Sequence, residues 1–119
     1  MLQERRQTPR VRAYQPVRLH RVGGDPHVME TLTKDLSVDG FRCLTQQVLP
    51  VASEVLIELV VAAGQEPVLA KGRSTWFRSL PQSEQFETGF QFVEMDQKNK
   101  RHLSAYLDRI STSSLAISD

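Results

Sequence analysis

Cysteine and long apolar runs are scarce in this sequence. Cys43 is the only cysteine among 119 residues, so the chain cannot form an internal disulfide or, by itself, a structural zinc site. The longest strongly apolar stretch, residues 55–63, is interrupted by Glu58 and falls well short of the ~20 residues that a membrane helix needs. The first ten residues lack the apolar core of a secretory signal. We therefore expect a cytoplasmic protein that does not enter a membrane.

Sequence motifs of metal binding and catalysis are also missing. The histidines stand in separate segments without ligand spacing, at His20, His27 and His102. The chain has neither a Gly-x-Ser-x-Gly elbow nor a phosphate-binding loop. Cys43, between Arg42 and Leu44 on an expected strand, is more typical of a packed side chain than of a nucleophile. Paired glutamates could still act as catalysts, but nothing in their spacing points to it. We expect no enzyme activity, no metal and no cofactor.

Length and composition indicate one globular domain. A chain of 119 residues, 39% of them hydrophobic and 24% charged, is long enough to bury a core without disulfides or metals. No internal repeat, low-complexity tract or linker divides it.

Positive charge is concentrated at the front of the chain. Residues 1–22 contain six arginines and one glutamate, a net charge of +5, whereas the remainder carries 9 basic and 13 acidic side chains, a net charge of −4. Such asymmetry suggests an anion-binding arm on a mildly acidic body. A solvated basic tail without a specific partner would give the same pattern, and composition alone does not decide between them.

Most of the chain has the pattern of short strands separated by turns. Strand-like runs are expected at residues 11–20, 28–36, 41–45, 55–61, 68–78 and 86–93. Pro16 interrupts the first run, which suits an edge strand or a bulge, and alternating apolar residues from Val55 to Val61 place one face of the fourth run in the core. Strands at this spacing indicate a closed barrel or a small sandwich rather than alternating strands and helices.

The periodicity changes near the C-terminus. Asp96 is a suitable N-cap for a helix, whose apolar positions follow with helical spacing at Leu103, Tyr106, Leu107 and Ile110. This stripe would cover an open edge or end of the sheet. Residues 111–119 are rich in serine and are expected to fray.

Two arginines with a three-residue spacer occur in the basic arm. Arg6 and Arg10 are separated by Gln-Thr-Pro and preceded by Arg5. A guanidinium group presents a planar fork of donors that fits a phosphate or the O6/N7 edge of guanine. Pro9 would lower the entropy lost when the arm becomes ordered. Taken alone, this spacing is a weak signal.

An Asp-x-Ser-x-x-Gly run begins at Asp35, near the end of the second expected strand. If Asp35 and Ser37 lie on one strand, both side chains point to the same face while Leu36 faces the core. The Asp35 carboxylate could then accept hydrogen bonds from guanine N1–H and N2–H, and the Ser37 hydroxyl could donate to a carbonyl or phosphate oxygen. Gly40 would permit a positive φ and a close approach of the ligand to the backbone. A plain β-turn uses the same residue types.

Together, the two runs resemble the motifs of the PilZ domain family, receptors for the bacterial second messenger cyclic di-GMP. The order and spacing of Arg-x-x-x-Arg and Asp-x-Ser-x-x-Gly agree with the family pattern. Residues 72–76, which end at Trp76, resemble a family strand that ends near a tryptophan, residues 89–92 its final strand, and residues 103–110 its closing helix. The resemblance implies a mainly β fold, a six-stranded antiparallel β-barrel with a C-terminal α-helix.

The resemblance also implies how the chain is divided and where the ligand lies. Residues 1–10 would be a flexible arginine arm, residues 11–110 the barrel with its closing helix, and residues 111–119 a frayed tail. The expected contacts with cyclic di-GMP come from Arg5, Arg6, Arg10, Asp35, Ser37, Gly40 and Trp76. Arg5 resembles an arginine of family members that bind two stacked ligand molecules, and Trp76 would be either a stacking face or a core residue.

The function that the resemblance implies is that of a receptor and adaptor. Ligand binding would order the arm and change the surface shown to an unidentified downstream protein. Two alternatives remain open. One is a small β-barrel that binds single-stranded nucleic acid through the basic arm and exposed aromatics, and the other is a PilZ-like adaptor that binds only a protein. No specific DNA binding is expected.

Overall fold

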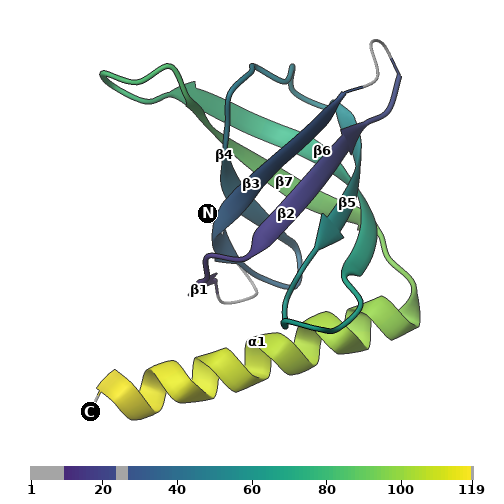
Figure 1. The fold of residues 1–119 in the computed structure, drawn as a ribbon, viewed down its shortest axis with the longest axis vertical. Helices are drawn as coiled ribbons and strands as arrows, with labels where there is room; N and C mark the ends of the chain where they lie inside the picture. The colour runs from purple at the N-terminus through teal and green to yellow at the C-terminus, as the bar shows by residue number, and fades with distance from the viewer. Residues whose placement is uncertain (1–9, 24–26, 119) are drawn as a thin grey trace, which may run out of the picture.

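Seven strands and one helix follow one another in the computed structural model, which describes residues 10–23 and 27–118, the last part from residue 112 as backbone only. The strands are β1 (Val11–Arg12), β2 (Pro16–Arg21), β3 (Val28–Leu36), β4 (Gly40–Thr45), β5 (Glu54–Leu59), β6 (Val68–Ser79) and β7 (Phe86–Glu94), and the helix is α1 (Gln97–Ser118). Figure 1 shows the strands wrapped into a barrel with α1 across one of its ends.

Six of the strands form a closed antiparallel barrel. Neighbouring strands follow the order β3-β2-β5-β6-β7-β4, and β4 returns to pair with β3, so every one of these strands has a partner on both edges. The short β1 is an additional strand that pairs with the end of β3 beyond β2. The predicted six-stranded antiparallel barrel with a C-terminal helix is confirmed.

The run predicted as one strand over residues 11–20 is split into β1 and β2. Pro16 is the first residue of β2, a position where its missing N–H costs the sheet no hydrogen bond. Thr33 of β3 holds the intervening residues, because its backbone N–H donates to the Gln15 carbonyl over 2.9 Å and its hydroxyl donates to the Ala13 carbonyl over 2.6 Å. The chain therefore stays against β3 on both sides of the interruption.

Side chains alternate between the two faces of each strand, and the inward-facing ones fill the barrel interior. Its fully buried aliphatic and aromatic side chains include Leu19, Leu36, Phe41, Ile57, Leu59 and Val68. The rings of Phe41 and Phe90 stack with their centroids 5.3 Å apart, a favourable aromatic geometry. Cys43 also faces this interior, and burial raises the pKa of its thiol to about 12, so it is a packed, protonated side chain at neutral pH.

Helix α1 closes one end of the barrel. As predicted, Asp96 caps it, accepting a hydrogen bond from the Asn99 N–H over 2.8 Å, and Leu103, Tyr106 and Leu107 are buried against the core. Its backbone continues to Ser118, beyond the predicted helix end at Ile110, since no glycine or proline occurs in residues 111–118 to stop it. Among the described residues, no helix combines the length and the apolar character needed to cross a bilayer.

Candidate functional site

The start of the described chain is fixed beside the end of β3. The Ala13 N–H donates to the Lys34 carbonyl over 3.2 Å, and in β1 Arg12 lies opposite Asp35. A hydrogen bond of 2.6 Å from the Gln15 amide to the Tyr106 hydroxyl ties the same segment to α1. These contacts bring Arg10, directly before β1, to the outer face of the barrel at Asp35.

Asp35 is held between two guanidinium groups. One carboxylate oxygen, Oδ1, lies 2.6 Å from Arg10 Nη1, and the other, Oδ2, lies 2.9 Å from Arg42 Nη2. Only 15% of the Asp35 side chain is exposed. Within the described part of the chain, Arg10 Nε and Arg42 Nε are buried and have no hydrogen-bond partner. The pair of arginines therefore keeps donors that an oxygen-rich ligand could satisfy after a rearrangement.

A second carboxylate, that of Glu87 on β7, continues this network along the wall. Arg78 Nε donates to Glu87 Oε1 over 2.8 Å, while Lys34 Nζ and Arg42 Nη1 lie 3.3 and 3.4 Å from Oε2. Burial tends to raise the pKa of Glu87, but the hydrogen bonds from Arg78 and Lys34 and the charge of Arg42 outweigh it, so the pKa is lowered. Glu87 is therefore an anion at neutral pH although its side chain is only 1% exposed.

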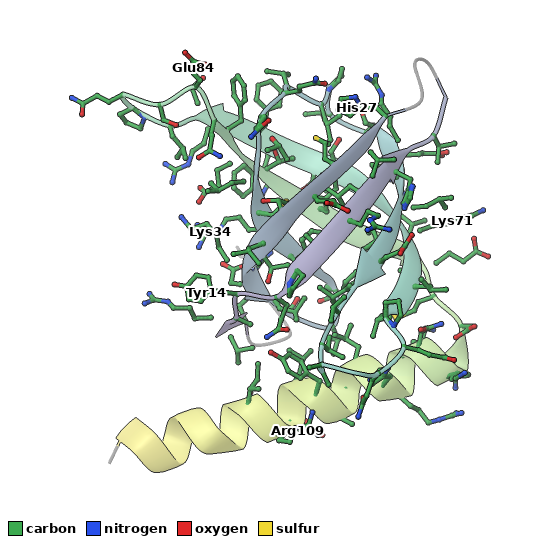
Figure 2. All side chains as sticks on the ribbon, viewed as in Figure 1. Tyr14, His27, Lys34, Lys71, Glu84 and Arg109 are labelled. Atoms are coloured by element: carbon green, nitrogen blue, oxygen red, sulfur yellow. The ribbon has the colours of Figure 1, made fainter. Side chains whose placement is uncertain are left out.

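A β-bulge explains how Lys34 and Asp35 can both join this outer network. Thr33 pairs with Cys43, and Asp35 pairs with the next residue, Arg42, so Lys34 is the extra residue on β3. Thr33 on one side and Leu36 on the other are buried. The bulge thus lets two consecutive side chains face outward, against the simple alternation of a strand. Figure 2 shows Lys34 projecting from the barrel on the side opposite Lys71.

Trp76 belongs to the same wall. Asp35 pairs with Arg42, Arg42 with Gly89, and Gly89 with Trp76, which gives one row across β3, β4, β7 and β6. Residues directly opposite one another in an antiparallel sheet share a face. The indole lies over Gly89, because a Cβ added there would overlap its Nε1 and Cε2 atoms. With 37% of its surface exposed, Trp76 is a half-covered aromatic face on the barrel wall and not a core residue.

Ser37 and Gly40 shape the turn between β3 and β4. Ser37 lies beyond the end of β3 and is buried, so the assumption that it shares a strand with Asp35 is wrong. Its hydroxyl accepts a hydrogen bond from the Asp39 N–H over 3.1 Å and donates to the Gly40 carbonyl over 3.4 Å. Gly40 does not have a positive φ, and the close approach it permits is to the Phe90 carbonyl of β7. Contacts of either residue with a ligand stay predictions.

The structure brings Arg10, Asp35 and Trp76 onto one wall and places Ser37 and Gly40 at its edge. Arg5 and Arg6, the other predicted ligand-binding residues, lie outside the described residues, as does most of the predicted arm. The sequence reasoning missed Lys34, Arg42, Arg78 and Glu87. Two of them could have been found from the sequence. Arg42 lies two residues after Gly40, and Arg78 lies two residues after Trp76, and residues at this spacing share one face of a strand.

Two of the histidines have polar partners outside this network. His20 Nε2 is 2.7 Å from Glu58 Oε2, and His102 Nε2 is 3.0 Å from Gln65 Oε1. In the parts of the chain that the structure covers, no three His, Cys, Asp or Glu side chains are grouped so that they could hold a metal ion.

Comparison with known protein families gives a match that covers most of the chain. The family model described as "PilZ domain" matches residues 4–109 of this chain. A search of the curated proteins gave no match.

Several solved structures share the fold. The Bacillus subtilis inhibitor of motility MotI/DgrA superposes with a TM-score of 0.77 at 15% identity, over 92% of this chain and 52% of its own. Escherichia coli YcgR in complex with c-di-GMP gives 0.76 at 16% identity, over 98% of this chain and 50% of its own. The PilZ domain of YcgR with c-di-GMP gives 0.70 at 17% identity and covers 98% of both chains. This chain therefore spans about half the length of the first two proteins and nearly all of the isolated domain.

Proposed function

Because the chain belongs to the PilZ domain family, we propose that it is a receptor for cyclic di-GMP whose ligand binds on the outer wall of the barrel, between the arginine arm and Trp76. The observation that carries the proposal is the contact between Arg10 Nη1 and Asp35 Oδ1 at 2.6 Å. It joins the last residue of the arginine motif to the first residue of the Asp-x-Ser-x-x-Gly motif, the two groups that a guanine reader needs within reach of each other.

The chemistry of this wall suits a guanine nucleotide. Asp35 can accept hydrogen bonds from guanine N1–H and N2–H, and Arg10 can pair with the O6/N7 edge or with a phosphate. In the structure these two side chains pair with each other. Binding would therefore exchange one charge-assisted contact for two contacts with the ligand, while the exposed face of Trp76 offers a stacking surface for a base.

The arm and a partner protein complete the proposal. Arg6 and Arg5 precede Arg10 and would add guanidinium groups over the same ligand, with Arg5 supporting a stacked pair of ligand molecules. Residues 1–10 would thereby become ordered against the barrel and create a surface that a downstream protein recognises. We expect a cytoplasmic binding module without catalytic activity, so the effect of the ligand passes to whatever protein reads that surface.

Isothermal titration calorimetry of the intact chain with cyclic di-GMP tests the proposal. We expect saturable binding whose stoichiometry distinguishes one ligand molecule from a stacked pair, and binding that weakens as salt rises, because phosphate contacts contribute. Chromatography of the ligand after incubation should recover it unchanged. Absence of binding at micromolar protein and ligand, with the protein folded, would overturn the assignment.

A further inference from the structure

Glu87 is the least expected charged group on the ligand wall. Residues that face outward from a barrel are normally wet, and a carboxylate is rarely buried unless it is paired. The Glu87 side chain nevertheless has only 1% of its surface exposed, and it is surrounded by Lys34, Arg42 and Arg78. Three cations from three different strands thus converge on one anion.

The geometry shows what these cations would do without the anion. Lys34 from β3, Arg42 from β4 and Arg78 from β6 all lie within 3.4 Å of a Glu87 carboxylate oxygen. Like charges that close to a common point repel one another in the weakly screened environment of a protein surface. Glu87 therefore gathers three side chains that would otherwise spread into solvent.

The three cations pair with Glu87 but remain partly exposed to solvent. Their side chains remain 38%, 33% and 64% exposed for Lys34, Arg42 and Arg78, respectively. Arg42 also reaches Asp35 with its other nitrogen, Nη2, over 2.9 Å. The cluster therefore includes Arg42 from the row between Asp35 and Trp76 and extends along the strands to Glu87 and Arg78, which pair with each other two residues further on.

We propose that Glu87 is the positioning residue of the ligand wall: its carboxylate assembles Lys34, Arg42 and Arg78 before the ligand arrives, so that they meet the phosphate groups of cyclic di-GMP at little cost in side-chain entropy. This inference rests on the proposed receptor function. Preorganised donors increase affinity because fewer rotamers have to be immobilised on binding. Glu87 itself makes no contact with the ligand in this proposal.

A positioning role predicts that loss of the Glu87 carboxylate weakens ligand binding, whereas an effect of net charge alone predicts the opposite. If only the overall potential mattered, removal of a carboxylate near an anionic ligand would tighten binding. Glu87→Gln is therefore compared with Glu94→Gln, which changes the net charge equally on the same strand. Glu94 is 71% exposed and pairs with Lys71, away from the cluster. Cyclic di-GMP binding is measured by calorimetry and by the fluorescence of Trp76, the only tryptophan in the chain.

We expect Glu87→Gln to weaken binding on the order of tenfold, the typical worth of a hydrogen bond to a charged group. Glu94→Gln should bind as tightly as the wild-type chain or slightly more tightly. In the ligand-free Glu87→Gln variant, the NMR signal of the Arg78 Nε–H should shift, because its 2.8 Å bond to Glu87 changes. The Arg18 Nε–H signal, from a group bonded to Glu30, should not.

Two outcomes overturn the inference. If the wild-type chain binds and Glu87→Gln binds equally or more tightly, Glu87 positions nothing and the receptor function survives. If the wild-type chain does not bind, the receptor function and this inference both fall.

A second variant keeps the inference testable even if Glu87→Gln unfolds. Arg78→Met removes one gathered cation and leaves Glu87 with Lys34 and Arg42, and Arg73→Met on the same strand is the matched control. We expect only Arg78→Met to lose affinity. Wild-type binding by Arg78→Met would mean that the assembled cations do not face the phosphates, and would overturn the inference.

Discussion

Arg10 Nη1 lies 2.6 Å from Asp35 Oδ1, although the two residues are 25 positions apart in the chain. The contact depends on Thr33, which holds the segment before β2 against β3, and on the pairing of Arg12 with Asp35. An arginine from the basic end of the chain and a carboxylate of the barrel wall are thus adjacent. The two groups are in the arrangement that recognition requires, and a ligand has to compete with their contact.

Replacement of Arg10 should weaken binding of cyclic di-GMP. We expect Arg10→Ala, and likewise Arg6→Ala, to cost on the order of 1–3 kcal/mol, by analogy with bidentate arginine–guanine contacts. Arg18→Ala is the matched control, because Arg18 belongs to the same basic region but pairs with Glu30 on β3. Calorimetry measures the affinity of each variant and distinguishes a specific contact of Arg10 with the ligand from a general electrostatic attraction by the basic segment. Equal losses in Arg10→Ala and Arg18→Ala would favour the general attraction.

Gly89→Ala should displace the indole of Trp76. The added Cβ would overlap the indole nitrogen, and the half-exposed ring can respond by turning away from the wall. We expect weaker ligand binding, by a part of the ~1–3 kcal/mol that stacking on a base contributes, and a shift of the tryptophan emission. Trp76→Ala should show the full loss, with thermal unfolding of both variants as the control for the fold. Unchanged affinity in Trp76→Ala would remove this residue from the site.

The strand segments were accessible from the sequence, but the arrangement of side chains on the outer wall was not. Apolar alternation and turn residues identified β2 to β7, because burial of one face leaves a period of two in the sequence. Irregularities in the strand pairing break that period. Lys34 and Asp35 face outward together, and on β6 the register shifts between Ser74 and Trp76.

The other site residues escaped prediction because their positions depend on contacts between strands or within a turn. The three cations around Glu87 come from β3, β4 and β6, and their convergence depends on barrel closure, which no local pattern encodes. Ser37 illustrates the reverse case, because the turn residues were recognised while the direction of the side chain was misread. Its hydroxyl is used within the turn, a common role for serine next to glycine.

Gly40→Ala should destabilise the protein even without a ligand. A Cβ at this position would overlap the Phe90 carbonyl oxygen, a backbone atom of β7 that cannot rotate away. Overpacking of this kind costs about 1–3 kcal/mol or more, so we expect a lower thermal unfolding midpoint. Gly64→Ser is the comparison for overlap. The positive φ of Gly64 makes the substitution strained while the space around it is open, so a loss of stability in this variant comes from the backbone conformation and not from overlap. A wild-type midpoint for Gly40→Ala would show that β4 can separate from β7 at this point.

The contribution of Glu87 to the stability of the protein should be lost at acidic pH. The pKa of Glu87 is lowered in the folded state, so its ionised form contributes stability above the ordinary pKa of a glutamate, about 4.3. That contribution is lost as the pH falls through the lowered pKa. We expect Glu87→Gln to lose on the order of 1–3 kcal/mol at pH 7, and the difference from the wild-type chain to shrink towards pH 3.

Denaturant unfolding at pH 7, 5 and 3 measures that difference. The lowered pKa of Asp96 affects both proteins alike, so it cancels in the comparison. A difference that stayed constant from pH 7 to pH 3 would mean that the charge of Glu87 does not stabilise the fold.

Removal of the Asp35 carboxylate separates a guanine reader from a barrel that binds single-stranded nucleic acid. An oligonucleotide binder relies on positive charge and exposed aromatics, so Asp35→Ala, which removes a negative charge, should leave its affinity unchanged or raise it. A guanine reader loses its acceptor for N1–H and N2–H, and it also releases Arg10 and Arg42 from their shared partner. We expect Asp35→Ala to lose on the order of 1–3 kcal/mol of cyclic di-GMP affinity. Fluorescence titrations with cyclic di-GMP and with a mixed-sequence oligonucleotide, at one salt concentration, measure both affinities, and tight oligonucleotide binding that survives Asp35→Ala would favour the nucleic-acid barrel instead.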